Sequence, residues 1–177
     1  MHQKSRQMAL CGLLTALAVV ILLLGGLIPL ATFCCPMLAI LVLLPLRLEC
    51  GSRLAATSWA AVSLIALLLV PDRELTMFYV FFGVYPLVKP AVDRLPSRVL
   101  RVLVKLLYCS AALAVSYALL IFLFRLEAIL AEFQTASLAL TLATFAMANV
   151  AFLLLDELIL RVEALWVRKL RSRFFRG

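Results

Sequence analysis

The sequence predicts an all-α fold, a polytopic integral membrane protein built as a compact bundle of six transmembrane helices. Three observations predict it: 66% of the 177 residues are hydrophobic, only 15% are charged, and the apolar residues gather in long runs that end at polar turns. Soluble domains carry roughly 45–50% apolar and about 25% charged residues, so these side chains cannot all be buried in a core of this size. A lipid bilayer therefore has to cover many of them.

The first apolar run extends from about residue 8 to 33 and follows a short basic segment. It is longer than the 7–15 apolar residues of a typical signal peptide, so a retained helix is expected. Gly25, Gly26 and Pro29 fall near its far end and predict a stop or kink there. The second run, residues 36–46, is the shortest, and it needs the residues before it to cross about 30 Å of hydrocarbon.

Four further helices complete the predicted bundle. They are expected over residues 54–70, 75–88, 102–124 and 136–160, with a polar turn at 71–74 and a basic loop at 89–98. The remaining residues, 161–177, place apolar side chains at helical spacing among basic ones. This pattern predicts a basic amphipathic tail on the membrane surface, either a solvated anchor or a docking surface for a cytoplasmic partner. The chain thus divides into a transmembrane domain, 1–160, and a cytoplasmic tail, 161–177.

The formal net charge of +8 is distributed unevenly along these spans. With six crossings, every Lys and Arg except Arg73 and Arg125 falls on the side that holds both termini. The positive-inside rule therefore places the N- and C-termini in the cytoplasm. Basic residues at helix ends anchor a protein in the bilayer, and no interleaving of aromatic and basic residues suggests binding to nucleic acid.

The residues that most often carry catalysis or bind metals are scarce. His2 is the only histidine, and no two of the five cysteines have the C-x-x-C spacing of a zinc or redox site. No phosphate-binding glycine loop or metalloprotease motif is found either. We therefore expect no enzyme, no cofactor and no metal.

Polar residues inside the last span are informative because lipid cannot satisfy them. Thr141, Thr144, Phe145 and Asn149 fall on one stripe of that helix. The stripe either forms hydrogen bonds between helices or lines a ligand site. Asp156 and Glu157 follow near the inner end, where Arg161 could pair with Glu157; the two acids are either structural or part of a proton or ion relay.

The span over residues 75–88 is rich in aromatic side chains and is interrupted by Gly83 and Pro86. Tyr79, Phe82 and Tyr85 offer either a stacking wall for a small molecule or part of an aromatic belt at the membrane interface. Ala9, Gly12 and Ala16 give the first helix a face of small residues. Such a face allows close approach, either by another helix of the bundle or by a separate membrane subunit.

The segment Arg6-Gln7-Met8-Ala9-Leu10, the small-residue first helix, six spans in 177 residues and the short second span resemble the substrate-binding S components of energy-coupling factor (ECF) transporters. Residues 81–89 and 149–156 are similar to stretches of bacterial membrane proteins grouped with them. The resemblance implies transport of a vitamin or precursor, captured in an outward-facing cavity. It also implies two kinds of partner, a transmembrane coupling subunit and two ATPase subunits.

The resemblance further implies which residues serve each role. The ligand-binding residues would be Phe33, Tyr79, Phe82, Tyr117, Thr141, Phe145 and Asn149. The coupling residues would be Ala9, Gly12 and Ala16, of which Gly12 and Ala16 have the four-residue spacing of the family motif. Because the expected cavity is apolar and aromatic, a flat or hydrophobic substrate fits it best. The alternative is an MreD-like scaffold, an integral membrane protein that organises partners without transporting anything.

Overall fold

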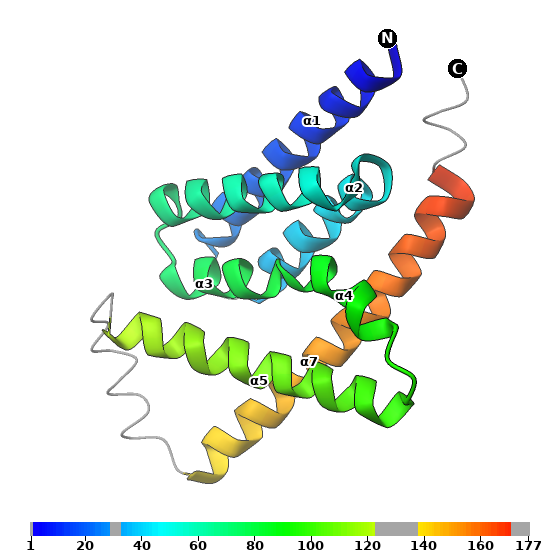
Figure 1. The fold of residues 1–177 in the computed structure, drawn as a ribbon. Coiled ribbons are helices and arrows are strands. Elements are labelled where there is room, and N and C mark those ends of the chain that lie inside the picture. The colour runs from blue at the N-terminus through cyan, green and yellow to red at the C-terminus, as the bar shows by residue number, and fades with distance from the viewer. Residues whose placement is uncertain (1, 29–32, 123–137, 171–177) are drawn as a thin grey trace. The chain divides into compact units, whose positions relative to one another are not determined.

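The structure, a computed structural model, describes residues 2–28, 33–122 and 138–170. These residues form an all-α fold, with helices coloured along the chain in Figure 1. The elements are α1 (His2–Gly25), α2 (Cys34–Leu69), α3 (Arg73–Phe82), α4 (Tyr85–Asp93), α5 (Arg98–Phe122), α7 (Leu138–Leu165) and the π-helical turn η2 (Trp166–Leu170). Within the described residues, five segments are long and apolar enough to cross a membrane, with α3 and α4 together forming one of them. The predicted helical class is confirmed.

The chain forms two compact units. One contains Met1–Val88 and Asp156–Gly177, and the other contains Lys89–Leu155. The tail predicted over residues 161–177 continues α7 as a helix, and η2 extends it to Leu170. Residues 171–177 lie outside the described residues, so a separate cytoplasmic tail stays a prediction.

A bend at Gly51 divides α2 into two arms. Gly51 has φ 86° and ψ 169°, a backbone conformation that favours glycine because it has no Cβ. Ile40 and Trp59 line one small cavity, although a straight helix would separate them by about 28 Å. The chain therefore doubles back at Gly51, as Figure 1 shows. Its two arms correspond to the separate helices predicted over residues 36–46 and 54–70.

The turn between α2 and α3 is fixed by side chains that cap the new helix. The Asp72 carboxylate accepts a hydrogen bond from the Leu75 N–H at 3.1 Å, which satisfies a free amide of the first turn. The Thr76 N–H and hydroxyl both donate to the Asp72 carbonyl. Arg73 donates to the carbonyl of Leu67 and ties the start of α3 to the end of α2.

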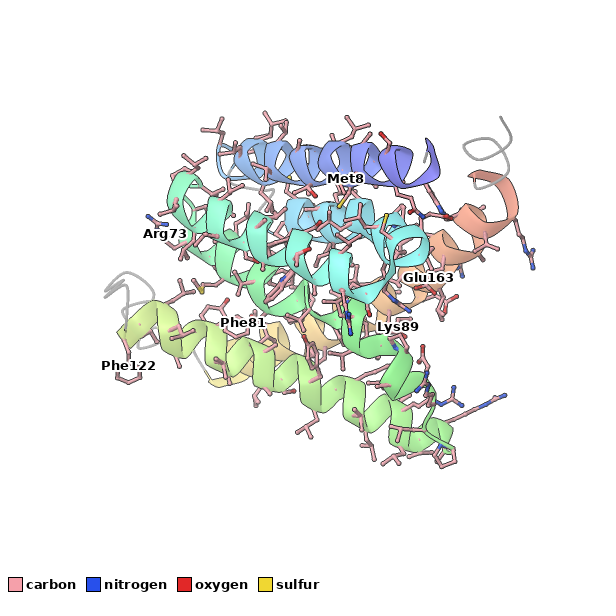
Figure 2. The ribbon with its side chains drawn as sticks, turned by 45° about the horizontal axis from the view of Figure 1, so that its top comes forward. Met8, Arg73, Phe81, Lys89, Phe122 and Glu163 are labelled. Atoms are coloured by element: carbon pink, nitrogen blue, oxygen red, sulfur yellow. The ribbon has the colours of Figure 1, made fainter. Side chains whose placement is uncertain are left out.

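The core of the first unit lies between α1, both arms of α2, and α3. Figure 2 shows side chains filling the space between these helices. Residues buried there share apolar or aromatic character, and they include Leu22, Ile40, Leu44, Val62, Ala66, Leu75, Tyr79 and Phe82. At one end of this core α1 approaches α2 closely, because a Cβ on Gly25 would lie 2.5 Å from Cys35 Cβ.

The structure confirms one sequence prediction along residues 71–105 and corrects another. The helix predicted over residues 75–88 is interrupted at Gly83, as predicted, and Gly83 and Val84 divide it into α3 and α4. A Cβ on Gly83 would lie 2.7 Å from Trp59 Cδ1, so glycine allows the indole to pack there. The predicted basic loop over residues 89–98 is wrong for its first half, because α4 continues to Asp93.

In the second unit α5 packs against the first part of α7. The rings of Tyr108 and Phe152 lie 6.0 Å apart, centroid to centroid. The Cys109 thiol, 3.9 Å from the Ala148 carbonyl oxygen, donates to it. α5 begins at Arg98, four residues earlier than predicted, because the Arg101 N–H already bonds the Ser97 carbonyl.

Candidate functional site

Two of the predicted ligand residues belong to a row of aromatic rings at α3. Phe33 meets Phe78 edge to face, with ring centroids 5.4 Å apart. Phe78 in turn stacks on Phe82 at 4.2 Å with an interplanar angle of 15°. The row begins at Phe33, which is 48% exposed, and ends at Phe82, which is 2% exposed. Sequence reasoning omitted Phe78, although its four-residue spacing from Phe82 places both rings on one helix face.

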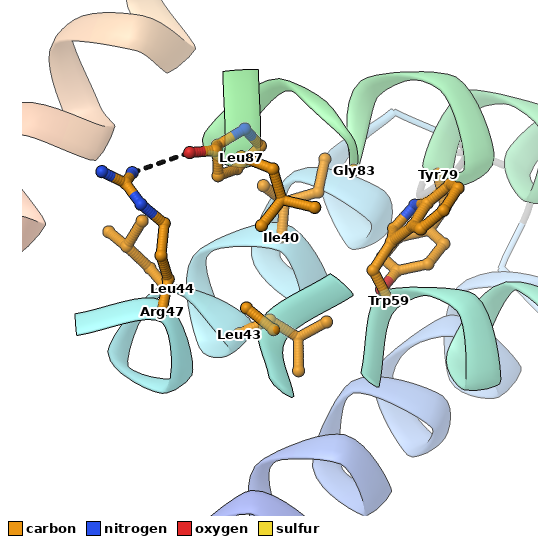
Figure 3. Close-up of a pocket in the computed structure, with 10 residues that line it drawn as sticks. Ile40, Leu43, Leu44, Arg47, Trp59, Tyr79, Gly83 and Leu87 are labelled. Carbon is orange, nitrogen blue, oxygen red and sulfur yellow. Dashed lines mark hydrogen bonds between the residues drawn. The ribbon is translucent and has the colours of Figure 1, made fainter. Parts of the chain in front are cut away.

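Tyr79 lies deeper than this row. Its side chain is fully buried, and its hydroxyl has no hydrogen-bond partner among the described residues. It lines a cavity of about 20 Å³, together with Trp59, Gly83 and Arg47. Figure 3 shows Tyr79 and Trp59 at one end of this cavity and Arg47 at the other. A cavity of this size holds about one water molecule, so in its described form it is too small for a vitamin.

The other predicted ligand residues belong to the second unit. Tyr117 is half-buried on α5, and Phe145 is 43% exposed on α7. The Asn149 amide donates to the Phe145 carbonyl of its own helix at 2.9 Å, whereas its buried Oδ1 has no partner among the described residues. The side chain of Thr141 lies outside the described residues. A single site formed from both groups of residues stays a prediction.

The predicted coupling face of α1 is uncovered in the part of the chain that the structure describes. Ala9, Gly12 and Ala16 are all exposed, and a Cβ on Gly12 would meet no atom within 4 Å. The face forms one wall of a shallow apolar hollow. Its lining residues come from α1 and the second arm of α2, and they are Met8, Cys11, Gly12, Thr15, Ala16, Val19, Val20 and Ile65. None of the described helices therefore covers the small residues of α1.

A charged contact that the sequence did not predict joins α2 to α7. One guanidinium nitrogen of Arg47 lies 3.1 Å from the Glu163 carboxylate. The same nitrogen donates to the Pro86 carbonyl at 2.7 Å, the hydrogen bond drawn in Figure 3. The Arg47 and Glu163 side chains are only 18% and 22% exposed. Because 116 residues separate the two along the chain, no local pattern could have indicated this pair.

A second contact ties α1 to the same region. The Glu49 carboxylate accepts a hydrogen bond from the Trp166 indole at 3.1 Å, and the Glu49 carbonyl accepts one from the Gln7 amide at 3.0 Å. We refer to Gln7, Arg47, Glu49, Glu163 and Trp166 as the polar clamp. The polar clamp holds together the beginning of α1, the bend of α2 and the end of α7.

The acids near the end of α7 have different partners. The Tyr85 hydroxyl donates to the Asp156 carboxylate at 2.5 Å, and both residues are buried. Glu157 instead forms an exposed ion pair with Arg161 at 3.1 Å, which confirms the predicted pairing. Asp156 thus has a structural contact, while a role for it in a proton or ion relay stays a prediction.

Within residues 2–28, 33–122 and 138–170, no group of three or more His, Cys, Asp or Glu side chains could hold a metal ion. Comparison with protein families, curated proteins and solved structures finds no match for this chain. Its function has to be inferred from the residues and their geometry.

Proposed function

We propose that this protein is the membrane-embedded substrate-binding subunit of an ECF-type importer in a bacterial plasma membrane, with six spans and both termini in the cytoplasm. The bend at Gly51 supports six spans. α2 is one of the five apolar segments, and because it bends there it can cross the membrane twice, which gives six crossings in all. Each arm of α2 is about 26 Å long at ~1.5 Å per residue, close to the thickness of the hydrocarbon core.

The polar clamp supports the orientation. It brings the beginning of α1, the bend of α2 and the end of α7 to one end of the first unit. The basic residues nearest to these three places include Lys4, Arg53 and Arg168. Basic residues concentrate on the cytoplasmic side, so that end is assigned to the cytoplasm.

The uncovered face of α1 is the observation that carries the proposal. A helix within lipid gains little from burying apolar side chains, so small residues indicate where a second helix can approach closely. Gly12 has open space above it, and Ala9 and Ala16 extend the exposed face along α1. This surface suits a transmembrane coupling subunit, which in turn would engage two ATPase subunits.

The aromatic row supports the choice of substrate class. Phe33, Phe78 and Phe82 present stacked and edge-to-face rings that lead from the surface into the first unit. Rings in this arrangement bind flat, apolar molecules through stacking. None of the three side chains carries a charge that could pair with a charged substrate. The substrate that we propose is therefore an aromatic or hydrophobic vitamin or vitamin precursor.

The test is co-purification of the tagged protein from native membranes in mild detergent, with mass spectrometry of proteins and small molecules. Ala16→Leu places a branched side chain on the exposed face of α1 and should abolish recovery of the coupling subunit and the ATPases. Ala114→Leu is the matched control, because Ala114 is exposed on α5. Equal recovery with both variants, or no importer subunits with the wild-type protein, would contradict the proposal.

A scaffold that organises other membrane proteins is the second candidate. The observation that favours it is the dense packing around Tyr79, where the described cavity holds about 20 Å³. A scaffold needs no larger cavity than this. Recovery of cell-shape or cell-wall proteins, without a bound small molecule, would replace the importer by the scaffold.

A further inference from the structure

The turn between α4 and α5 concentrates positive charge. Residues 89–105 carry a single acidic side chain, Asp93, against five basic ones, which are Lys89, Arg94, Arg98, Arg101 and Lys105. Nitrogen-bearing side chains gather around this turn in Figure 2, where Lys89 is labelled. We refer to these six residues as the α4–α5 corner.

One carboxylate connects the two helices at this corner. Asp93 lies 3.5 Å from the Lys89 ammonium, one turn earlier on α4, and 3.4 Å from the Lys105 ammonium on α5. Asp93 is 35% exposed, whereas the Lys89 and Lys105 side chains are only 2% and 11% exposed, so the carboxylate pairs with two largely buried lysines. Arg101 precedes Lys105 by four residues on α5, which puts its side chain on the same face of the helix. Asp93 therefore holds the two lysines of the corner, one on each helix.

The arginines of the corner are suited to an oxyanion. Arg94 and Arg98 are exposed, and Arg101 is half-buried. The Nε of Arg101 is buried without a hydrogen-bond partner among the described residues. A guanidinium offers N–H groups in a planar fork that matches a phosphate, and a buried N–H group is costly when it has no acceptor. A phosphate would provide that acceptor.

The helix itself adds to the attraction. The first turn of α5 has no acidic residue, although Arg98 and Arg101 stand there. Cations at a helix N-terminus oppose the helix dipole, whereas an anion is favoured there. An anion at the corner would interact favourably with both the arginines and the dipole.

The surface next to the corner is apolar rather than polar. Val102 follows Arg98 by one turn and is 45% exposed, and Leu103 and Leu107 are 56% and 71% exposed. Charged groups at one end of an exposed apolar helix match an amphiphile, with its headgroup at the corner and its acyl chains along α5. A free phosphate or a nucleic acid would leave these apolar side chains without a role. The partner chemistry is therefore that of a lipid.

We propose that the α4–α5 corner binds an anionic phospholipid, with the phosphate held by Arg94, Arg98 and Arg101 and the acyl chains lying against Val102 and Leu103. Basic clusters beside a transmembrane helix bind anionic headgroups, and each cation beside the bound headgroup contributes roughly fivefold in affinity. This lipid site goes beyond the proposed function and does not depend on it. Bound lipid can be measured whether or not the protein transports a substrate.

The experiment measures lipid retention by native mass spectrometry. The full-length protein is reconstituted in vesicles of equal parts phosphatidylcholine and phosphatidylglycerol and then released into mild detergent. The wild-type protein should retain phosphatidylglycerol in preference to phosphatidylcholine. The double variant Arg98→Gln/Arg101→Gln should lose this preference by about 25-fold, from roughly fivefold per charge.

The control removes the same charge elsewhere. Arg53→Gln/Arg168→Gln changes two exposed arginines of the other unit, outside the α4–α5 corner, and should leave the preference for phosphatidylglycerol largely unchanged. Arg98→Lys/Arg101→Lys keeps the charge and should restore most of the retention, which separates lipid binding from a folding defect. A phosphatidylglycerol with a photoreactive acyl chain should crosslink to residues 98–107.

Three results would overturn the lipid site. They are equal loss of phosphatidylglycerol in the test and control pairs, crosslinks confined to other helices, and displacement of the lipid by inorganic phosphate. Loss of a co-purifying protein with unchanged lipid retention would assign the corner to a protein contact instead.

Discussion

The first helix and the α3–α4 segment show opposite relations between hydrophobicity and burial. α1 is the most apolar of the five described segments that could cross a membrane, yet only 17% of its most apolar stretch is buried. The α3–α4 segment is the least apolar of the five, and 61% of it is buried. Lipid covers an apolar side chain as well as protein does, so hydrophobicity alone does not select which helix goes inside.

Polar and aromatic side chains determine which helix is buried within the protein. The Tyr85 hydroxyl reaches the Asp156 carboxylate on α7, and the Val80 carbonyl of α3 accepts a hydrogen bond from the Trp59 indole on α2 at 3.2 Å. On α1, by contrast, the Thr15 hydroxyl donates to the Cys11 carbonyl of its own helix at 2.7 Å. α1 therefore satisfies this hydroxyl locally, and its polar contacts to α2, through Gln7 and Cys11, lie in its first half. α3 and α4 instead have polar partners on α2 and α7 along their length.

The largest expected effect comes from adding a methyl group to the buried segment. Gly83→Ala should lower the free energy of unfolding by about 3 kcal/mol, because its Cβ would lie 2.7 Å from the Trp59 ring and 2.6 Å from the Tyr79 carbonyl oxygen. Reversible unfolding in mixed neutral and anionic detergent micelles gives this value. An unchanged unfolding free energy would show that α3 and the second arm of α2 are not packed as described.

The polar clamp should have the next largest effect. Arg47→Met removes the donor to Glu163 and to the Pro86 carbonyl, and it should lower the free energy of unfolding by about 2 kcal/mol. Arg161→Met is the matched control. Its ion pair with Glu157 is 72% and 56% exposed, so the change should be below about 0.5 kcal/mol. Equal effects in the same micelle assay would remove the distinction between the two pairs.

The buried hydrogen bond of α4 should contribute somewhat less. Tyr85→Phe removes the hydroxyl that donates to Asp156 at 2.5 Å and should destabilise the protein by about 1.5 kcal/mol. The double variant Tyr85→Phe/Asp156→Leu should cost less than the sum of the two single changes, since each removes the same bond. Additive losses in unfolding free energy would contradict a direct interaction.

Helix positions and breaks were predictable because they depend on local chemistry. Glycine near the end of the first run, proline and aspartate between residues 70 and 73, and glycine at position 83 all mark helix ends in the structure. The pairing of Glu157 with Arg161 was predictable for the same reason, because four residues place both side chains on one helix face.

The contacts between distant segments were not predictable in this way. Arg47 and Glu163 are 116 residues apart, and Glu49 and Trp166 are 117 apart. Within lipid many apolar faces are interchangeable, so the order in which helices pack depends on a few polar contacts of this kind. Tyr79 shows the consequence: its aromatic position suggested a ligand contact, whereas the structure gives it a buried place beside a cavity of about 20 Å³.

The smallest expected effect is an increase in the free energy of unfolding, and it tests the exposed helix of the comparison, α1. Gly12→Ala should raise the free energy of unfolding by about 0.5–1 kcal/mol, because alanine favours a helix over glycine and the added Cβ would meet no atom within 4 Å. Gly12→Leu should be as stable in the micelle assay but should lose the partner that Gly12→Ala still recovers from native membranes. Destabilisation by Gly12→Ala would mean that this face is already packed against the protein's own helices. If both variants recovered the partner equally, the small residues would face lipid, and the uncovered surface of α1 would no longer support a coupling subunit.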